Sequence, residues 1–215
     1  GTENGLDIFD GYKFKNYHMD SFDSKSILGN KVSAIYESDN NLIWVGSELG
    51  FSSFNPATQK FTRPSLNNSN IANPEKITED KNGKIWIKEV QPGRLFTYDF
   101  NRDILKCISC DQDEVLFDQT INNLHKANNG TLWIGTNEGL YFHDINDDQI
   151  RPVESEYPLN IKKPYNVTSI ESGLDNVLWV GTKQGLIQID EEDKSKINLF
   201  KNSRIRNSIV SNVIN

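Results

Sequence analysis

The residue types best suited to binding a ligand gather in a few polar segments of the chain. Residues 88–94 (KEVQPGR) contribute Lys88, Glu89, Gln91 and Arg94. Residues 62–73 and 152–166 contribute Arg63, Asn67, Asn68, Lys162, Lys163 and Tyr165. These side chains offer charge-assisted hydrogen bonds and an aromatic ring for stacking, a combination that suits a sugar and an acidic sugar in particular. An ordinary variable surface is the alternative interpretation.

Patterns for catalysis or for metal binding are weak. His18, His125 and His143 lie far apart in the sequence, whereas a metal site needs ligands that converge. A glycosidase needs two carboxyl groups across one cleft, a placement that a sequence cannot show. The chain has neither a glycine-rich phosphate loop nor a Gly-x-Ser-x-Gly turn. We therefore expect no catalytic residue, no metal and no cofactor in this segment.

The two cysteines, Cys107 and Cys110, form a Cys-x-x-Cys pair in the stretch DILKCISCDQDE. A pair with this spacing can be a redox centre or half of a zinc site, but the flanking residues lack the strand-to-helix junction of a thioredoxin-like motif. The other interpretation places one thiol inside a strand and one near its end, where the two can oxidise to each other. The sequence leaves open whether they form a disulfide.

Composition and charge narrow the class of partner. The chain has 215 residues, with 23 Lys and Arg against 30 Asp and Glu, so its formal net charge is -7. This charge repels the phosphate backbone of a nucleic acid, which we therefore exclude as a partner of this segment. No apolar run approaches the roughly 20 residues of a membrane helix, and the first residues do not resemble a signal peptide. We expect no membrane contact except through a helix outside these residues.

The elements that must position these side chains form a repeat of 42–47 residues, the length of one four-stranded propeller blade. Similar stretches recur: NLIWVGSELGF, GKIWIKEVQPGRL, GTLWIGTNEGL and NVLWVGTKQGL. They contain Trp44, Trp86, Trp133 and Trp179, and three of them have a glycine two residues later: Gly46, Gly135 and Gly181. A residue that recurs at the same position of every repeat usually has a structural role. We therefore expect the tryptophans to pack between blades rather than to stack on sugars.

Each repeat reads as four strands, A to D. Before each tryptophan stands a pair that tolerates positive φ, namely Asn40-Asn41, Asn82-Gly83, Asn129-Gly130 or Asp175-Asn176. These pairs predict type I′ turns between strands A and B. No segment sustains a 3.6-residue apolar period, so helices should be scarce. The sequence therefore predicts an all-β chain built from four-stranded antiparallel propeller blades.

The register of the repeat assigns each part of the chain to a blade. Residues 30–63, 74–108, 120–153 and 166–201 form four complete blades. Residues 1–17 form strands C and D of a partial blade, and residues 207–215 form strand A of another. We therefore interpret the chain as an excerpt of a longer array, with an open arc that pairs with another copy as the alternative.

Two stretches of the sequence, WIGTNEGLYFHDI and WVGTKQGLIQID, match the repeat pattern of a known protein family. They resemble two-component regulator propeller repeats, of the pattern D-x-x-G-x-[IL]-W-[IV]-G-T-x-x-G-[IL]-x-x-[FY]-D, and the likeness covers essentially the whole chain. The resemblance implies the periplasmic sensor region of an inner-membrane hybrid histidine kinase, common in Bacteroides-type gut bacteria. In that family, propellers of usually seven blades precede a membrane helix and a kinase, and the receptor is expected to be a homodimer.

The resemblance also implies a function. Such a sensor would detect oligosaccharides released from glycans and switch on polysaccharide-utilisation genes. None of the kinase motifs lies in these residues, so no catalytic position carries over. Two alternatives stay open because propellers host many functions. One is an enzyme of the streptogramin-lyase type, and the other is a protein-interaction scaffold without catalytic activity.

The second repeat departs most from the family pattern. Lys88 and Glu89 replace the Gly-Thr pair, and one extra residue precedes Gly93. Because strands alternate in direction, the B–C and D–A loops of a propeller share one face, where ligands usually dock, and this irregularity would lie there. The stretch from Asp80 to Trp86 resembles the Asp-box turn of sialidase-type propellers with one extra residue. That turn is structural, so we expect no catalytic role for Asp80.

Overall fold

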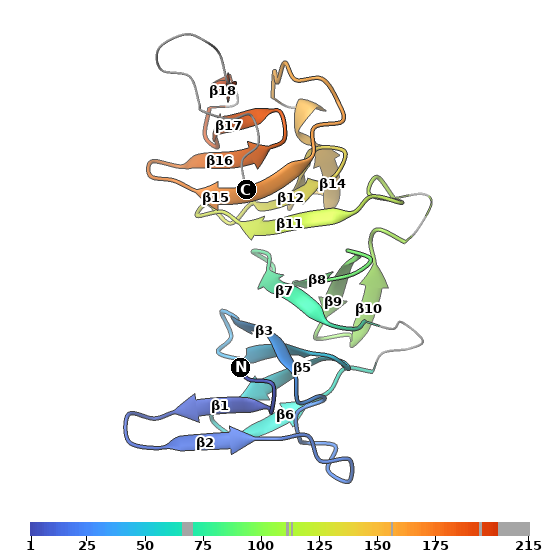
Figure 1. Cartoon of the computed structure of the whole chain (residues 1–215), viewed down its shortest axis with the longest axis vertical. Helices are drawn as coiled ribbons and strands as arrows, with labels where there is room; N and C mark the ends of the chain where they lie inside the picture. The colour runs from blue at the N-terminus through green and yellow to red at the C-terminus, as the bar shows by residue number, and fades with distance from the viewer. Residues whose placement is uncertain (66–70, 111, 113, 156, 194, 202–215) are drawn as a thin grey trace. The chain divides into compact units, whose positions relative to one another are not determined.

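The chain folds into antiparallel β-sheets that fall into two compact units, Gly1–Asp111 and Gln112–Asn215. The computed structural model describes residues 1–65, 71–110, 112, 114–155, 157–193 and 195–201 (Figure 1). In those residues the one helical element is the short 3-10 helix η1 (Val153–Ser155). None of their helical structure is long and apolar enough to cross a membrane. The secondary structure of the described chain is therefore nearly all β.

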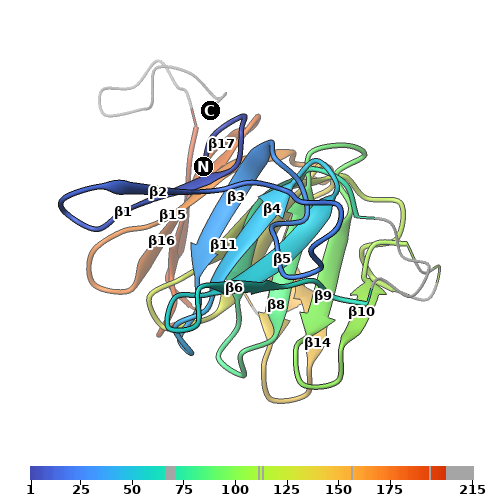
Figure 2. The same ribbon diagram turned by 90° about the horizontal axis from the view of Figure 1, so that it is seen from below.

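The first unit contains a hairpin and two four-stranded sheets. The hairpin pairs β1 (Leu6–Phe9) with β2 (Phe14–Tyr17). The first sheet has the strand order β3 (Val32–Glu37), β4 (Ile43–Ser47), β5 (Gly50–Asn55) and β6 (Lys60–Thr62). The second sheet consists of β7 (Pro74–Glu79), β8 (Ile85–Glu89), β9 (Leu95–Asp99) and β10 (Ile104–Cys107). Figure 2 shows the hairpin beside the first sheet, where Leu6 and Tyr17 pack against Phe54.

The second unit contains two further four-stranded sheets. The third sheet consists of β11 (Ile121–Lys126), β12 (Leu132–Thr136), β13 (Leu140–Asp144) and β14 (Gln149–Pro152). The fourth sheet consists of β15 (Val167–Ser172), β16 (Val177–Thr182), β17 (Gly185–Asp190) and β18 (Ile197–Phe200). Strand β11 lies beside β15, as β3 lies beside β7 in the first unit.

Each four-stranded sheet has the topology of a propeller blade. Its strands are consecutive in the sequence, antiparallel, and hydrogen-bonded to their sequence neighbours. In all four sheets the pairing of strand A with strand B shifts by one residue within the first three residues of strand A. Such a shift is a β-bulge, which increases local twist. The predicted all-β fold of four-stranded antiparallel blades is confirmed.

Two of the four tryptophans, Trp44 and Trp133, lie in cores between adjacent sheets of one unit. Trp44 is 1% exposed and packs with Phe51 of its own sheet and with Phe96 and Tyr98 of the second sheet. In the second unit, Trp133 is equally buried, in a core that includes Leu178 and Val180 of the fourth sheet. Trp86 is buried and Trp179 is half-buried.

The glycine after the tryptophan allows strand A of the next sheet to come close. A Cβ atom on Gly46 would lie 2.8 Å from Cβ of Pro74, the first residue of β7. A Cβ atom on Gly135 would lie 2.5 Å from Cγ1 of Val167, the first residue of β15. Real Cβ atoms do not come this close to a neighbour, so any larger residue must push the next strand away.

The turns between strands A and B differ from the sequence prediction in three of the four blades. Positive φ at two successive residues, the mark of a type I′ turn, occurs at Asp175 and Asn176 alone of the four predicted pairs. In the other three pairs only the second residue, Asn41, Gly83 or Gly130, has positive φ. All four loops have the same length, because the residue paired with each tryptophan stands eight positions before it. In these three loops a type I turn is followed by a left-handed residue, as in a G1 bulge, and in the first of them the N–H of Asn41 bonds the carbonyl oxygen of Ser38. In the fourth blade the N–H of Val177 bonds the carbonyl oxygen of Leu174, so the turn lies one position later in the loop. Predicted strand A at residues 207–215 lies outside the described residues.

Candidate functional site

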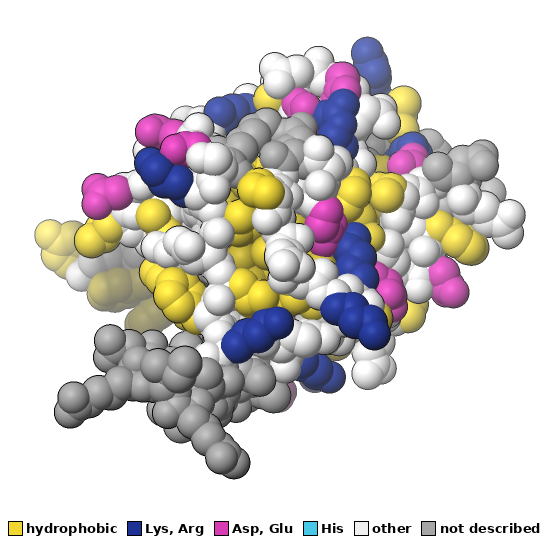
Figure 3. All heavy atoms as spheres, turned by 90° about the horizontal axis from the view of Figure 1, so that it is seen from above, with side chains coloured by type: hydrophobic (Ala, Val, Ile, Leu, Met, Phe, Trp, Pro, Cys, Tyr) yellow, Lys and Arg dark blue, Asp and Glu magenta, His cyan; other side chains and the backbone are white. Residues whose placement is uncertain are grey.

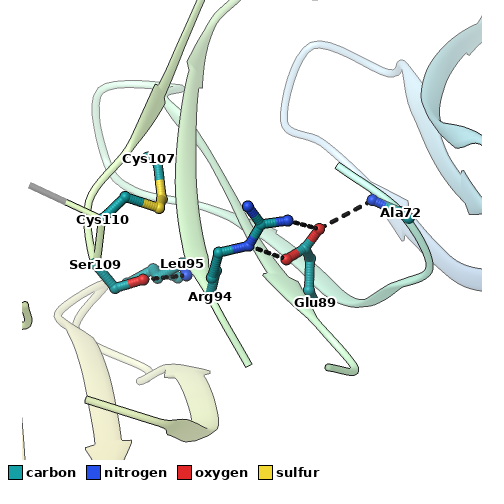
Figure 4. Close-up of a disulfide and its surroundings, with 7 residues drawn as sticks. All are labelled: Ala72, Glu89, Arg94, Leu95, Cys107, Ser109 and Cys110. Atoms are coloured by element: carbon teal, nitrogen blue, oxygen red, sulfur yellow. Dashed lines mark hydrogen bonds and ion pairs between the residues drawn. A yellow bond between two sulfur atoms is a disulfide. The ribbon is translucent and has the colours of Figure 1, made fainter. Parts of the chain in front are cut away.

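The irregular loop of the second blade surrounds a buried carboxylate, that of Glu89 (Figure 4). Glu89 ends β8 and its side chain is 1% exposed. Its Oε1 accepts hydrogen bonds from the backbone N–H of Ala72 and from Nη2 of Arg94, both at 2.9 Å. Its Oε2 accepts one from Nε of Arg94 at 2.6 Å. The backbone N–H of Glu89 donates to the carbonyl oxygen of Arg94 at 3.1 Å, which closes the loop.

This arrangement explains why a charged pair occurs here. A buried carboxylate is costly unless a cation and hydrogen bonds satisfy both oxygens, and the guanidinium fork of Arg94 meets that need. Arg94 also lies over the ring of Phe96, with 5.1 Å from Cζ to the ring centroid. Its side chain is 36% exposed, so part of it is accessible to solvent. The carboxylate of Glu89 is buried and paired with Arg94, so it is not exposed to bind a ligand from solvent.

Lys88 is also buried. It stands two residues after Trp86, where the other three repeats have glycine, and its ammonium forms an ion pair with Glu75 of β7. Gln91 lies in the loop itself and is exposed. Of the four polar residues predicted in this segment, Gln91 is therefore the one whose side chain is mainly exposed to solvent.

Arg63 follows β6 and holds the segment before β3. Its Nε donates to the carbonyl oxygen of Ser26 at 3.1 Å, and its Nη2 donates to Oγ of Ser26 at 2.7 Å and to the carbonyl oxygen of Ile27 at 3.1 Å. Arg63 also lines an open cleft of about 470 Å³ together with Lys25 and Lys60. Asn67 and Asn68, from the same predicted segment, lie outside the described residues.

The predicted residues of the second unit divide between the core and the surface. Tyr165 is fully buried, donates a hydrogen bond to Oε1 of Glu154 at 2.5 Å and accepts one from the backbone N–H of Leu140 at 3.2 Å. Burial, and then the hydrogen bond to Glu154, raises the pKa of the Tyr165 phenol far above its ordinary value. The expectation that Tyr165 stacks on a ligand is therefore wrong for this structure, because its ring is covered by the core.

Lys162 and Lys163 are exposed in the segment that leads to β15. Lys163 forms an ion pair with Oε2 of Glu154 at 3.0 Å, and its ammonium lies 5.4 Å from the ring centroid of Tyr141. Lys162 and Lys163 thus contribute two exposed cationic side chains to the surface of the second unit, one of them paired with Glu154.

Polar side chains of the B–C turns tie each turn to the D–A segment of the same unit. Both carboxylate oxygens of Glu48 accept backbone N–H groups, from Asn30 at 3.1 Å and Lys31 at 2.7 Å. Asn137 accepts the N–H of Thr120 at 2.9 Å. The contact between Glu89 and Ala72 repeats this link in the second blade. The B–C and D–A loops of each unit therefore lie on one face, and sequence reasoning missed these turn residues as links.

Cys107 and Cys110 form a disulfide at the end of β10 (Figure 4). This resolves the alternative left open by the sequence in favour of two thiols oxidised to each other. In the described residues no group of three His, Cys, Asp or Glu side chains is placed to hold a metal ion. His125 contacts Oγ of Ser172 at 2.8 Å, and His143 contacts Asp148 at 2.8 Å.

Asp80 has a structural position in its turn. Its Oδ2 accepts the indole N–H of Trp86 at 3.0 Å, and its Oδ1 accepts the backbone N–H groups of Asn82 and Lys84. The side chain is buried, with 1% exposure of the residue. A carboxylate used in this way holds the turn and anchors the tryptophan of the same blade.

A cavity that the sequence did not predict lies between the hairpin and the first sheet. Its volume is about 390 Å³, and its lining residues are Ile8, Asp10, Lys13, Lys15, Tyr17, Phe54, Pro56 and Gln59. The signal that could have found it is the two-residue spacing of Lys13, Lys15 and Tyr17, which places them on one face of a strand.

On the face shown in Figure 3, Lys and Arg side chains are interspersed with Asp and Glu and with hydrophobic side chains, so the net negative charge forms no single acidic patch there.

The fold and the tryptophan cores define a class of protein: the chain consists of β-propeller blades. Residues 26–48 and 115–138 match the family model described as "Two component regulator propeller". These two segments are therefore similar to repeats of that family. No curated protein sequence matches the chain significantly.

Solved structures share the fold at low sequence identity. The extracellular domain of BT3049 from B. thetaiotaomicron, described as a hybrid two-component system, is 22% identical with a TM-score of 0.66, and the match covers 99% of this chain and 28% of that one. PorZ, a surface component of the type-IX secretion system of Porphyromonas gingivalis, is 17% identical with a TM-score of 0.66, and the match covers 98% and 32%. Virginiamycin B lyase from Staphylococcus aureus is 16% identical with a TM-score of 0.60, and the match covers 93% and 63%.

These likenesses concern the fold. The chain spans less than a third of the length of the three B. thetaiotaomicron chains that it resembles. A propeller can carry a sensor, a lyase or a scaffold, so the fold by itself does not choose between them.

Proposed function

We propose that this chain is part of the ligand-sensing propeller region of a hybrid two-component sensor and that it lies outside the cytoplasm, in the periplasm. The observation that carries the proposal is the match of two segments of the sequence, residues 26–48 and 115–138, to the two-component regulator propeller family. The parent protein would then be a histidine kinase anchored by a membrane helix, and this segment would have no catalytic role of its own.

The disulfide supports the location. Disulfides form and persist mainly in oxidising compartments such as the bacterial periplasm. Cys107 and Cys110 are bonded to each other, and the described chain has no free cysteine. A periplasmic location is also where a sensor meets molecules released outside the cell.

The proposed ligand is an oligosaccharide that binds the face formed by the B–C and D–A loops. In the first unit, Gln91 is exposed in the irregular loop and the Arg94 side chain is partly exposed. In the second unit, Lys162 and Lys163 are exposed before β15. Amide and ammonium groups donate hydrogen bonds to hydroxyl and carboxylate oxygens, and the ammonium groups favour an acidic sugar. Each unit thus supplies its own polar surface.

Signalling would follow from a shift between two arrangements of a dimeric receptor. A ligand shifts such an equilibrium by as much as its affinity differs between the two states. The output would be the activation of genes for polysaccharide use.

The experiment is a titration of the chain with a panel of neutral and uronic-acid oligosaccharides by calorimetry. We expect saturable binding to one member of the panel. Gln91→Ala tests the polar surface of the first unit and Lys162→Ala tests that of the second, and at least one of the two substitutions should weaken the binding. Lys196→Ala is the control, because Lys196 precedes β18 in the C–D turn of the fourth sheet, away from the B–C loops. The absence of binding to every member would contradict the ligand class. In the full-length protein, binding without any change in autophosphorylation would favour the scaffold.

A further inference from the structure

The Cys107–Cys110 disulfide lies at an accessible edge of the second sheet. Strand β10 ends at Cys107 and is the outermost strand of that sheet, where it pairs with β9. Cys110 is exposed and Cys107 is half-buried. A reductant in solution can therefore reach Cys110 without any opening of the sheet.

The disulfide closes a very short loop, which points to a local role. The stabilisation that a disulfide gives grows with the length of the loop it closes, since it acts mainly on the unfolded chain. The two cysteines are only three positions apart, and the residues between them are Ile108 and Ser109. Reduction should therefore change the order of nearby residues more than the stability of the unit.

Both residues inside the disulfide loop hold Leu95, the first residue of β9. The backbone N–H of Ile108 donates to the carbonyl oxygen of Leu95 at 2.8 Å. The backbone N–H of Leu95 donates to Oγ of Ser109 at 3.0 Å (Figure 4). The backbone N–H and the carbonyl oxygen of Leu95 are thus both hydrogen-bonded to a segment whose conformation the disulfide fixes.

Leu95 follows Arg94 directly, so the same contacts continue into the irregular loop. Arg94 holds the carboxylate of Glu89, and Glu89 accepts the N–H of Ala72. Figure 4 shows this continuous series of contacts, from the disulfide through Ser109 and Leu95 to Arg94 and Glu89. The loop that departs from the family repeat is therefore linked to the disulfide.

We propose that Cys107–Cys110 is a site of thiol–disulfide exchange, and that its state controls the order of the loop between Glu89 and Leu95. The reactant is a dithiol. Its thiolate attacks Sγ of Cys110, the S–S bond breaks, and the electron pair leaves on Sγ of Cys107, which takes up a proton. The second thiol of the reactant then attacks the mixed disulfide and releases Cys110. The protein disulfide gains two electrons and two protons, and the dithiol is oxidised to a disulfide.

The test equilibrates the whole chain in buffers of reduced and oxidised dithiothreitol and counts free thiols by maleimide labelling and mass spectrometry. Hydrogen exchange of the Leu95 amide is followed in the same samples. We expect full reduction of the folded chain, and about tenfold faster exchange of the Leu95 amide, the change that follows from loss of one hydrogen bond. The amide of Leu140, in the second unit, should keep its rate. Cysteines that become reducible only when the chain unfolds, or an unchanged Leu95 rate after reduction, would overturn the proposal.

Two variants separate the disulfide from the hydrogen bond that it positions. Ser109→Ala keeps both cysteines but removes the acceptor for Leu95, so its Leu95 amide should exchange fast in oxidised and reduced samples alike. Cys107→Ser with Cys110→Ser should show the fast rate at every potential. If the double variant does not fold, Ser109→Ala and chemical reduction still decide the question. A slow Leu95 amide in oxidised Ser109→Ala would contradict the proposed link.

Discussion

The clearest quantitative prediction concerns Trp133, whose indole fills the core of the second unit. The residue is 1% exposed, and its ring centroid lies 5.7 Å from that of Phe142 and 6.1 Å from that of Tyr157. Its Nε1 donates a hydrogen bond to Oε1 of Glu191 at 2.8 Å, across to the fourth sheet. Replacement by alanine removes both the ring contacts and this bond.

The expected cost follows from burial. A tryptophan buries roughly 150–250 Å², and at about 25 cal/mol per Å² this corresponds to about 4–6 kcal/mol as an upper bound. Measured Trp→Ala substitutions in cores cost about 3–5 kcal/mol. We therefore expect Trp133→Ala to lower the free energy of unfolding by about 3–5 kcal/mol. For a unit of this size, the melting temperature should fall by about 15–30 °C.

Trp179 provides the matched control, because it occupies the same position of the next repeat. It is half-buried, and its described ring contact is with Phe200 at 6.1 Å between centroids. Trp179→Ala should cost less, on the order of 1–2 kcal/mol. Calorimetry of the full chain measures both variants, and exchange of amides in β12 and β13 shows which unit has lost stability. Equal losses in the two variants, or an unchanged melting temperature for Trp133→Ala, would refute the reasoning from burial.

Three other predictions follow from close contacts in the structure. Gly135→Ala should lower stability by about 1–3 kcal/mol in urea unfolding, because its Cβ would lie 2.5 Å from Cγ1 of Val167. Tyr165→Phe should cost about 1–2 kcal/mol in the same assay, since it removes the hydroxyl group that donates to Glu154 and accepts the N–H of Leu140. The pKa values of Tyr98 and Tyr165 are raised by burial and then by hydrogen-bonded carboxylates, so the unfolded chain ionises first, near pH 10, and stability should fall as the pH rises above about 10. Unfolding free energies measured between pH 8 and 11 check the slope, which Tyr98→Phe should reduce.

The regular parts of the fold could be predicted because each leaves a periodic mark in the sequence. The spacing of Trp44, Trp86, Trp133 and Trp179 gives the blade length, and the apolar positions around each give the strands. The reason why glycine stands two residues after a tryptophan cannot be seen in the sequence. Gly46 and Gly135 are required by the side chains of Pro74 and Val167, which stand about 30 residues later in the chain.

Turn geometry and side-chain burial could not be read from the same pattern. Asn40-Asn41 and Asp175-Asn176 are similar pairs in loops of equal length, yet the turns that contain them differ. One turn is closed by a hydrogen bond from Asn41 to Ser38 and the other, one position later, by a bond from Val177 to Leu174, so the pair alone does not fix where the turn lies. Tyr165 looked suited to stacking, but its ring is buried in a core whose members come from five strands, β12, β13, β15, β16 and β17, and from the segments next to them. The burial of a tyrosine ring cannot be predicted from residue type when the side chains that bury it come from distant parts of the chain.

The second repeat shows why a departure from a repeat is not by itself a binding site. Lys88 and Glu89 replace residues that are small in the other repeats, and the structure pairs each new charge inside the same unit, with Glu75 and Arg94. Removing Arg94 leaves the buried carboxylate of Glu89 without its cation, at a cost of up to about 3–5 kcal/mol. Arg94→Ala would therefore reduce stability and ligand binding together, and it could not tell the two effects apart. Substitution of the exposed Gln91 leaves the buried pair in place, so a loss of binding in Gln91→Ala with unchanged stability is the result that would distinguish a ligand contact from a structural one.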